Sequence, residues 1–491
     1  MMPSKREFGC SQTSRSTCRM RVPHRFGEAI RQQFLVGMLL TALSRFLLVT
    51  SYSTMGPREK FEKTFQDICL PHPFASKYQE RLMRPRNPDT DQYVIFSFSE
   101  RNHGHNGGLG DRLGGLITAV AFALRTDRIL LIAGDKPFEE SFRPYVSKSS
   151  SLHERVTYAN WEWAGWQPHY HRNMTFNRGC VNPRPRNTPC ALDSAVADYS
   201  STRVLKHRGN RAYLCRWGIK ESLGLSEELH RTLGMTRDSD LYELAGCMLR
   251  LVLWPTEAMW ATLDQWLEVS MHAVSSGPIR FQIGLHFRCG DASFGRGVKR
   301  DRQCVFESAD TWKGTSFADD FSLDSPVDEA TCGEALLRQH SSVEKKGVLA
   351  YIASDNADTA RQINASLGWD PSIAPTDSCH VDLAATSLCS RMTYVQWFML
   401  ALSDQIVMQS LKNNDAVFSP YHEVSSETQA LDAHFKQYAK QGPISAFSRY
   451  ASIYALHKDV MRYGLGCGRI NKTALSWQTQ GNWLCGPKLF Y

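Results

Sequence analysis

A glycine-rich loop between a strand and a helix constrains the fold of this chain of 491 residues more than any other feature. The loop, Gly107–Gly115, follows the apolar run Tyr93–Phe98 and opens into a segment whose apolar residues recur at helical spacing as far as Leu124. A second apolar run, Arg128–Ile132, comes directly after it. Strand, helix and strand in this order are typical of a βαβ crossover, which joins parallel strands. We therefore predict an α/β fold.

The same loop is a candidate binding site. Glycines such as Gly108 and Gly110 allow backbone N–H groups to approach a ligand closely, and the helix N-terminus behind them carries partial positive charge. A phosphate or a sugar hydroxyl could bind there. The alternative interpretation is a tight turn that only joins two packed elements.

The charge of the chain is unevenly distributed. The formal net charge is +8, but much of the basic excess lies in residues 1–33, where seven arginines and lysines between Lys5 and Arg31 face only Glu7 and Glu28. Because this excess lies in a tail and not on a folded face, the charge gives little support to a role in nucleic-acid binding. The length exceeds that of one ordinary core and predicts two or three domains.

The most apolar run of the chain, Phe34–Val49, follows this basic tail and is interrupted by Arg45. A membrane span needs about 20 apolar residues. As a signal anchor over residues 34–54, it would leave residues 1–33 in the cytoplasm and the rest of the chain in the lumen. A signal peptide cleaved near Ser51, or an amphipathic helix, are the alternatives. We favour the anchor, because tail and run occur in the order that targeting requires.

Sequons and cysteines agree with a secretory compartment. Acceptor sequons for N-glycosylation begin at Asn173, Asn364 and Asn471. Twelve cysteines, an even number, lie from Cys69 onward, which suits disulfides. No group of cysteines and histidines has the spacing of a zinc site. Plausible local pairs are Cys180 with Cys190 and Cys467 with Cys485, although the sequence leaves the connectivity open.

Turn-forming residues divide the remaining chain. Residues 55–91 contain five prolines and are predicted to be a stem. The cluster Ser275–Pro278 marks a boundary between a first domain, residues 92–275, and a second domain, residues 276–491.

The second domain opens with a predicted strand that ends in charged residues. Apolar and other residues alternate from Phe281 to Phe287, and His286, Arg288 and Asp291 lie at its end. In open α/β sheets, ligands bind at the carboxyl ends of the strands. The planar guanidinium of an arginine pairs with two phosphate oxygens at once. The alternative is an ion pair between Arg288 and Asp291 that only holds a loop.

Two later segments add polar groups in similar positions. The predicted strand Gly347–Ala353 is followed by Asp355, which could accept from a nucleobase or ribose or could cap the next helix. Ser445, Ser448 and an arginine begin another predicted helix and form a possible phosphate site. Ordinary N-capping by Ser445 is the alternative.

Together, these pieces resemble the fucosyltransferase-like glycosyltransferases of the GT-B type. This group includes protein O-fucosyltransferases, α1,6-fucosyltransferases and plant xyloglucan fucosyltransferases. The likeness rests on Gly107–Ile132, on Gly284–Asp291 and on Ser354–Leu456. The second segment is similar to the family's His-x-Arg-x-Gly-Asp pattern, which is its most specific signature. Within the third segment, before Ser445 and Ser448, this chain carries an insertion, residues 412–442.

The resemblance implies an inverting transferase with two Rossmann-like domains that face each other across a cleft. GDP-fucose would be bound mainly by the second domain, a glycan or glycoprotein would be the acceptor, and neither a metal nor another cofactor would be required. With the N-terminal anchor, such an enzyme would be a type II protein of the Golgi or ER membrane with a lumenal catalytic domain.

The resemblance also assigns roles to single residues. Arg288 would bind the diphosphate, with His286 and Asp291 beside it. Asp355 would meet the guanine or ribose, and Ser445 and Ser448 would donate to phosphate. Gly108, Gly110 and Asp111 would face the donor phosphate and the acceptor.

The sequence offers two candidates for the catalytic base. Some branches of the family carry a glutamate shortly after the Gly-Asp of the signature, but Ala292–Arg296 contains no carboxylate. Asp111 is the first candidate for deprotonating the acceptor hydroxyl and Glu100 the second. Asp111 could instead be a helix N-cap, and a dissociative reaction would need no protein base.

Three other functions fit parts of the sequence. A GT-B enzyme that uses another nucleotide sugar would have the same architecture. A GT-A enzyme would bind a metal through an Asp-x-Asp motif, and Asp89–Asp91 and Asp238–Asp240 match that pattern, although neither follows a clear strand. A catalytically inactive nucleotide- or glycan-binding protein is the third. The sequence does not determine the acceptor, the linkage or the oligomeric state.

Overall fold

The computed structural model describes the backbone in segments. These are residues 55–87, 89–98, 108–151, 153–161, 172–174, 199, 201–207, 241–273, 281–287, 305–308, 311–313, 321–322, 348–354, 360–361, 372–373, 387–409, 412–413, 446–456, 459–463 and 468–471. The predicted tail, residues 1–33, and the predicted anchor, residues 34–54, lie outside them. None of the helices in the described segments is both long and apolar enough to cross a bilayer. Gly56–Tyr491 forms one compact unit.

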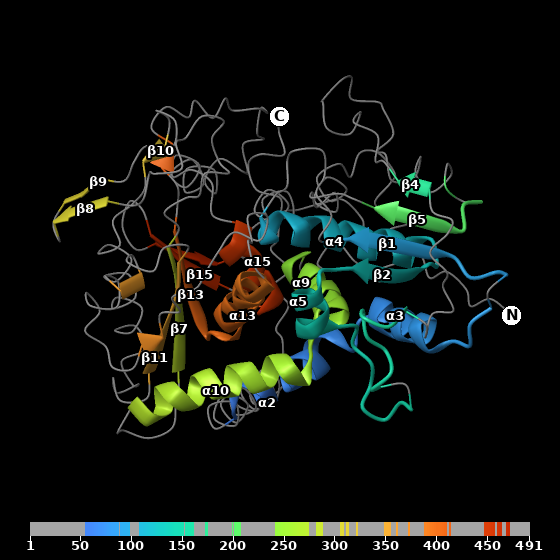
Figure 1. The fold of residues 1–491 in the computed structure, drawn as a ribbon, viewed down its shortest axis with the longest axis horizontal. Coiled ribbons are helices and arrows are strands. Elements are labelled where there is room, and N and C mark those ends of the chain that lie inside the picture. The colour runs from blue at the N-terminus through green and yellow to red at the C-terminus, as the bar shows by residue number, and fades with distance from the viewer. Residues whose placement is uncertain are drawn as a thin grey trace, which may run out of the picture. The chain divides into compact units, whose positions relative to one another are not determined.

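The first sheet contains the predicted crossover. Its strand order is β2-β1-β5-β4, and all its strands are parallel. Strand β1 (Tyr93–Ser97) leads through α4 (Leu109–Arg125) to β2 (Ile129–Ala133), and β1 pairs with β2 from Tyr93↔Ile129 onward (Figure 1). Strands β5 (Val204–His207) and β4 (Arg172–Met174) complete the sheet. The predicted α/β character of this region is confirmed.

Both faces of the first sheet are buried, as parallel sheets require. Val94 and Phe96 of β1 join the main core, to which α4 also contributes. Tyr93 and Ile95 point to the opposite face and pack in a second apolar cluster with residues of β2 and β5. A nearly continuous run of apolar residues is the pattern expected of such a strand.

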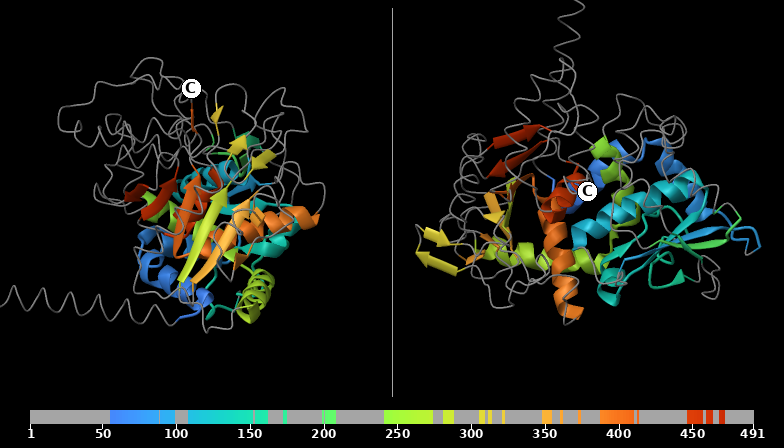
Figure 2. Two further views of the ribbon diagram at one scale, coloured as in Figure 1. Left: turned by 90° about the vertical axis from the view of Figure 1, so that its left-hand side faces the viewer. Right: turned by 90° about the horizontal axis from the view of Figure 1, so that it is seen from above.

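The second sheet has the order β12-β11-β7-β13-β15-β16. Strand β7 (Phe281–Phe287) pairs in parallel with β11 (Val348–Ser354) on one side and with β13 (Gln405–Gln409) on the other. Helix α13 (Ser387–Leu402) packs against β7 and β11. Figure 2 shows the sheet from two further directions. The two strands predicted from the sequence in this region, Phe281–Phe287 and Gly347–Ala353, are therefore present.

The other elements described in this unit are short strands and the helices of the core. The helices are α2 (Pro57–Thr64), a π-helix (Phe65–Cys69), α3 (Pro73–Met83), α5 (Lys136–Ser141), α9 (Leu241–Val252), α10 (Glu257–Ala273) and α15 (Ala446–Tyr454). The strands are β3 (Phe142–Arg143), β6 (Trp254–Pro255), β8 (Val305–Ser308), β9 (Thr311–Lys313), β10 (Phe321–Ser322), β12 (Ser372–Ile373), β14 (Lys412–Asn413), β15 (Asp459–Tyr463) and β16 (Gly468–Asn471).

The predicted stem, residues 55–91, is part of the folded body. It forms α2, the π-helix and α3, and Phe61, Phe65 and Phe74 are buried in the main core. Two of the prolines that suggested a linker, Pro57 and Pro73, are the first residues of helices. A proline is tolerated there because the N–H it lacks has no partner within the helix in any case. The prediction of a stem was wrong for this reason.

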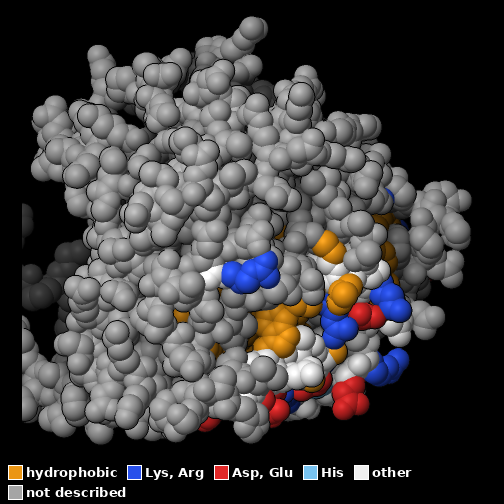
Figure 3. Space-filling view, turned by 60° about the vertical axis from the view of Figure 1, so that its left-hand side comes forward, with side chains coloured by type: hydrophobic (Ala, Val, Ile, Leu, Met, Phe, Trp, Pro, Cys, Tyr) orange, Lys and Arg blue, Asp and Glu red, His pale blue; other side chains and the backbone are white. Residues whose placement is uncertain are grey.

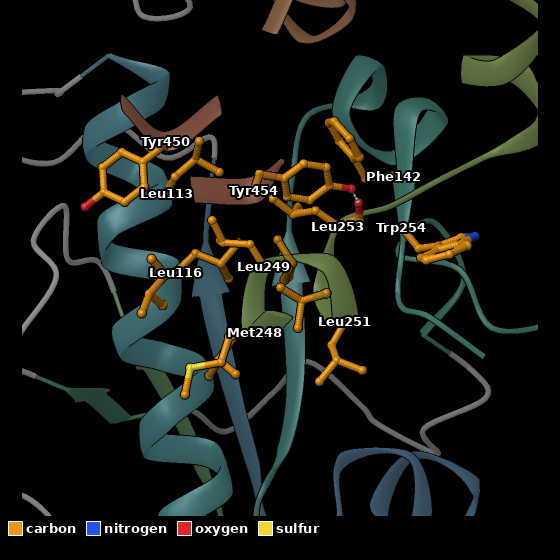
Figure 4. Packing of buried hydrophobic residues seen from close by; sticks show 14 of the residues in the cluster. Leu113, Leu116, Phe142, Met248, Leu249, Leu251, Leu253, Trp254, Tyr450 and Tyr454 are labelled. Atoms are coloured by element: carbon orange, nitrogen blue, oxygen red, sulfur yellow. Dashed lines mark hydrogen bonds between the residues drawn. The ribbon is translucent and has the colours of Figure 1, made fainter. Parts of the chain in front are cut away.

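One aromatic side chain of α2 joins several distant elements. The ring of Phe61 lies 5.2 Å from that of Trp254 and 5.5 Å from that of Phe398, between ring centroids. It also stacks on Tyr454 of α15, at 5.7 Å. Figure 4 shows this part of the core, where the Tyr454 hydroxyl donates to the carbonyl of Leu253 at 2.6 Å. Helices α2, α13 and α15 therefore share one core.

Arg250 of α9 is buried beside this cluster, with 2% of its surface exposed. Its guanidinium lies 4.2 Å from the centroid of the Phe61 ring. Its Nε donates to the carbonyl of Tyr454 at 2.6 Å and its Nη1 to that of Phe61 at 3.2 Å. Burial lowers the pKa of Arg250 to about 10, so it remains charged at neutral pH. Arg250 therefore fastens the C-terminal end of α15 to α2 and α9.

A disulfide connects two segments that are far apart in the sequence. Cys69, at the end of the π-helix, is bonded to Cys247 of α9, and 178 positions separate them. Both side chains are fully buried. The prediction of disulfides is thus confirmed, whereas the two proposed local pairs lie outside the described residues.

Replacing both cysteines, Cys69→Ala with Cys247→Ala, should lower the free energy of unfolding by about 2–5 kcal/mol, because the crosslink restricts the unfolded chain over a long loop. Urea denaturation followed by tryptophan fluorescence measures the change. Lys136→Met serves as a control, because the side chain of Lys136 is 83% exposed. Coincident curves for the double variant and the wild type would contradict the expectation.

Gly246→Ala tests the close approach of α9 and α15. A Cβ at this position would lie 2.2 Å from the carbonyl oxygen of Ile453, so the two backbones would have to separate. We expect a net loss of about 1–3 kcal/mol from the overpacking, although alanine favours a helix by about 1 kcal/mol over glycine. In the control Gly56→Ala, the added Cβ meets nothing within 4 Å, and thermal unfolding should shift much less.

Candidate functional site

The carboxyl ends of three parallel strands meet at one edge of the second sheet. His286, near the end of β7, is in register with Ala353 of β11 and with Met408 of β13. This is the edge at which ligands bind in open α/β sheets. His286 is 4% exposed and faces the interior.

A ring contact brings the beginning of α15 to this edge. The imidazole of His286 stacks on the ring of Phe447, with 5.2 Å between centroids and 26° between planes. Phe447 is the second residue of α15, and Ser448, which is fully buried, is the third. The structure therefore brings together two of the predicted donor-binding residues, His286 and Ser448, from segments far apart in the sequence.

The start of α15 is suited to an anion. The first four N–H groups of a helix have no partner within the helix, and the aligned peptide dipoles give this end partial positive charge. A phosphate at such an end accepts several hydrogen bonds at once. The first turn of α15 adds the hydroxyl of Ser448 and the guanidinium of Arg449 to this end.

Helix α4 packs against α15. Figure 4 shows Leu113 of α4 beside Tyr450 of α15. One turn before Leu113, α4 begins with Gly108 as its N-cap, and Gly110 is buried in the first turn. The N-terminal half of this helix, with its glycines, thus belongs to the same region as the start of α15.

The geometry of α4 rules out one interpretation of Asp111. The N-cap of the helix is Gly108, without a side-chain hydrogen bond, so Asp111 is the third residue of the helix and not its N-cap. The side chain of Asp111 lies outside the described part of the structure. Its role as the base stays a prediction.

Arg112 is a residue of the glycine loop that the sequence analysis missed. Its side chain is nearly buried, and Nη1 donates to the carbonyl of Phe98 at 2.6 Å. Phe98 directly follows β1, so this bond ties the strand end to the first turn of α4. The signal available in the sequence was an arginine among glycines at a predicted helix start.

A second missed group lies at the carboxyl end of β2. Asp135 accepts from the backbone N–H of Phe138 at 2.9 Å and thereby caps α5. It also accepts from the hydroxyl of Tyr394 of α13 at 3.3 Å. Burial, with a further contribution from the charge of Asp135, raises the pKa of nearby Glu139. These carboxylates follow β2 of the first sheet, at the N-cap and within α5. A raised pKa brings a carboxylate closer to the pKa of an effective general base.

The Asp89–Asp91 triplet is not arranged as a metal-binding motif. It precedes β1 instead of following a strand, and Asp91 is fully buried. Although burial opposes its ionisation, the backbone N–H of Asn87 and the guanidinium of Arg84 lower the pKa of Asp91. This side chain is therefore part of a structural ion cluster. Asp238–Asp240 is outside the described residues.

Several other predicted site residues also lie outside the described part of the chain. They are Glu100, Arg288, Asp291, Asp355 and Ser445. Arg288 follows directly after β7, Asp355 follows directly after β11, and Ser445 directly precedes α15.

The face seen in Figure 3 carries described side chains of both charges next to an apolar patch. Lysine and arginine side chains lie close to aspartate and glutamate side chains there. A nucleic-acid site would instead gather one sign of charge. This face therefore gives no support to such a function.

Comparisons with solved structures find fucosyltransferases. Arabidopsis thaliana FUT1 in complex with GDP has a TM-score of 0.40 and 12% identity, with 84% of this chain and 81% of that chain covered. NodZ α-1,6-fucosyltransferase soaked with GDP-fucose has a TM-score of 0.36 and 14% identity, with 78% and 99% covered. POFUT1 in complex with GDP-fucose has a TM-score of 0.31 and 12% identity, with 66% and 91% covered.

No protein-family model matches the chain, and no curated protein sequence matches it significantly.

His207, at the carboxyl end of β5, gives the first sheet a sensitivity to acid. Burial lowers the pKa of its imidazole from 6.5 to about 3. In the unfolded chain the same ring takes up a proton below about pH 6.5. Acid therefore favours the unfolded state from that pH downward, until the folded protein can also bind the proton near pH 3.

Lowering the pH from 7 to 5 should reduce the free energy of unfolding by about 2 kcal/mol through the protonation of His207 in the unfolded chain. The variant His207→Phe removes the titrating imidazole and keeps an aromatic ring beside Phe96. The difference in unfolding free energy between wild type and variant, measured in urea at several pH values, should change by that amount. A difference that is constant across this range would show that His207 does not titrate as expected.

Proposed function

We propose that this chain is an inverting glycosyltransferase of the GT-B type that transfers L-fucose from GDP-fucose to a hydroxyl of a glycan or glycoprotein. The stacked contact between His286 and Phe447 carries the proposal. It joins the strand of the His-x-Arg-x-Gly-Asp pattern to the serine-containing helix start. These are two of the segments on which the family resemblance rests, and they meet at the edge where an α/β sheet binds its ligand.

The chemistry of this edge fits a nucleoside diphosphate as leaving group. As the bond to the sugar breaks, negative charge grows on the phosphate oxygens. Preformed donors at the start of α15, together with Ser448, can stabilise that charge without reorganisation. In this proposal Arg288 and Ser445 add donors to the diphosphate with His286 and Asp291 beside them, and Asp355 meets the guanine or ribose. No metal is needed to neutralise the leaving group.

The acceptor would lie on the side of the first sheet. Gly108, Gly110 and Asp111 would border it, and Asp111 would take the proton of the attacking hydroxyl, with Glu100 as the second candidate. Attack on the face opposite to the departing diphosphate inverts the sugar carbon. The two sheets would belong to two Rossmann-like domains, residues 92–275 and 276–491.

The proposed site of action is the lumen of the Golgi or ER, with residues 34–54 as the membrane anchor. The disulfide between Cys69 and Cys247 supports an oxidising compartment. The basic tail before the apolar run supports the orientation.

Arg288→Ala should lower kcat/KM for GDP-fucose by roughly 100- to 1,000-fold, the range found when a donor to a developing oxyanion is removed. Full-length protein in detergent is assayed for release of GDP in the presence of EDTA, with glycan and glycoprotein acceptors. Circular dichroism should show an unchanged fold. Lys136→Met, on an exposed position of α5, is the control and should retain wild-type turnover.

A panel of nucleotide sugars separates the alternatives. Turnover of a different sugar nucleotide would retain the GT-B enzyme and reject the fucose donor. GDP binding in calorimetry without turnover of any donor would indicate a catalytically inactive binding protein. Near-normal turnover by Arg288→Ala would contradict the assignment of the diphosphate site.

A further inference from the structure

One buried arginine at the candidate site lacks the hydrogen-bond partners that the others have. Arg449 is the fourth residue of α15 and is 6% exposed. Its guanidinium lies 5.3 Å from the ring centroid of Tyr450. Its Nε is buried and makes no hydrogen bond within the described structure, and no described carboxylate forms an ion pair with it.

The other buried arginines show what is unusual about Arg449. Each donates to at least one backbone carbonyl: Arg112 to Phe98, Arg128 to Tyr199 and Thr202, Arg143 to His153, and Arg250 to Tyr454 and Phe61. These carbonyls compensate for the water that each guanidinium loses on burial. Among the described residues, Arg449 lies against the face of the Tyr450 ring, which attracts a cation, and donates to no carbonyl.

The position of Arg449 aims it at the start of α15. Side chains of a helix lean toward its N-terminus, so a long side chain at the fourth residue extends back over the first turn. The same first turn contains Ser448 and Phe447, and the ring of Phe447 stacks on His286. Tyr450, on which Arg449 lies, is beside Leu113 of α4 (Figure 4).

The electrostatics of this position require an anion. An arginine cannot lose its proton in a protein, so Arg449 carries a full positive charge. A charge that is buried without a partner is costly, and the partial positive charge of a helix N-terminus increases that cost. A bound anion compensates both the cost of burying the charge and the unfavourable interaction with the helix N-terminus. A guanidinium is also the group whose planar shape matches two phosphate oxygens.

We infer that Arg449 binds the diphosphate of the nucleotide sugar and stabilises the diphosphate as it leaves. This inference rests on the proposed function and adds to it a second guanidinium besides that of Arg288. Arg449 contacts the phosphates from the side of α15, where Ser448 and the helix N–H groups also donate.

Arg449→Met tests this assignment, because methionine keeps an unbranched apolar side chain over Tyr450 and removes the charge. Calorimetry with the full-length protein measures binding of GDP, of guanosine and of inorganic pyrophosphate. GDP and pyrophosphate should bind at least 10-fold more weakly to the variant, whereas guanosine binding should not change. Arg449→Lys, which keeps the charge without the planar fork, should give a smaller loss.

The Tm without ligand separates binding from a structural role. Arg449→Met should leave the Tm of the ligand-free protein unchanged or higher, because it removes a buried charge that has no partner. The matched variant Arg250→Met removes a guanidinium that donates to two carbonyls and should lower the Tm. A fall of the Tm in Arg449→Met like that in Arg250→Met, with all three ligands weakened equally, would overturn the inference.

The ligands also distinguish this inference from the proposed function. If GDP binds equally well to wild type and Arg449→Met, the inference is wrong and the proposed function is unaffected. If pyrophosphate binding depends on Arg449 but no nucleotide sugar is turned over, the anion site stands and the proposed transferase does not. A wild-type protein that binds neither GDP nor pyrophosphate would overturn both.

Discussion

The position of helix α15 depends on the hydrogen bonds of one buried cation. Arg250 donates to the carbonyls of Tyr454 and Phe61, and so holds the last turn of α15 against α2 and α9. Gly246 lets the backbones of α9 and α15 approach more closely than any side chain would permit. With its C-terminal end fixed in this way, α15 presents its first turn to the carboxyl edge of the second sheet, where Phe447 stacks on His286. The candidate site therefore rests on packing at the far end of the helix.

The two ends of α15 have opposite electrostatic needs. A cation near a helix C-terminus interacts favourably with the dipole, and Arg250 meets that condition with its bond to the carbonyl of Tyr454. A cation near the N-terminus is unfavourable, yet Arg449 lies in the first turn. The buried arginine at the C-terminal end of α15, which comes from α9, is satisfied by carbonyls of the fold, whereas Arg449 in the first turn of α15 has no such carbonyl among the described residues. This asymmetry indicates a structural role for Arg250 and a binding role for Arg449.

The features predicted correctly from the sequence are those that depend on local periodicity. The crossover from β1 through α4 to β2 follows from a buried apolar run, a glycine turn and helical spacing, all within 41 consecutive residues from Tyr93 to Ala133. Long-range partners left no local signal. The pairing of Cys69 with Cys247 and the bond from Tyr394 to Asp135 each join segments far apart in the sequence. The stem was misassigned because prolines at helix starts and prolines in linkers look alike in composition.

Charges of opposite sign lie at the carboxyl ends of the two sheets. Asp135 and Glu139 follow β2, whereas the start of α15 beside β7 carries Arg449 and the partial positive charge of a helix N-terminus. A transfer reaction of the proposed kind uses both signs, because the acceptor hydroxyl must lose a proton while the diphosphate gains negative charge. The glycines at the start of α4 contribute backbone N–H groups to this region without adding a titratable group. On this argument the glycine loop positions the reacting groups, and the surrounding side chains supply the charge.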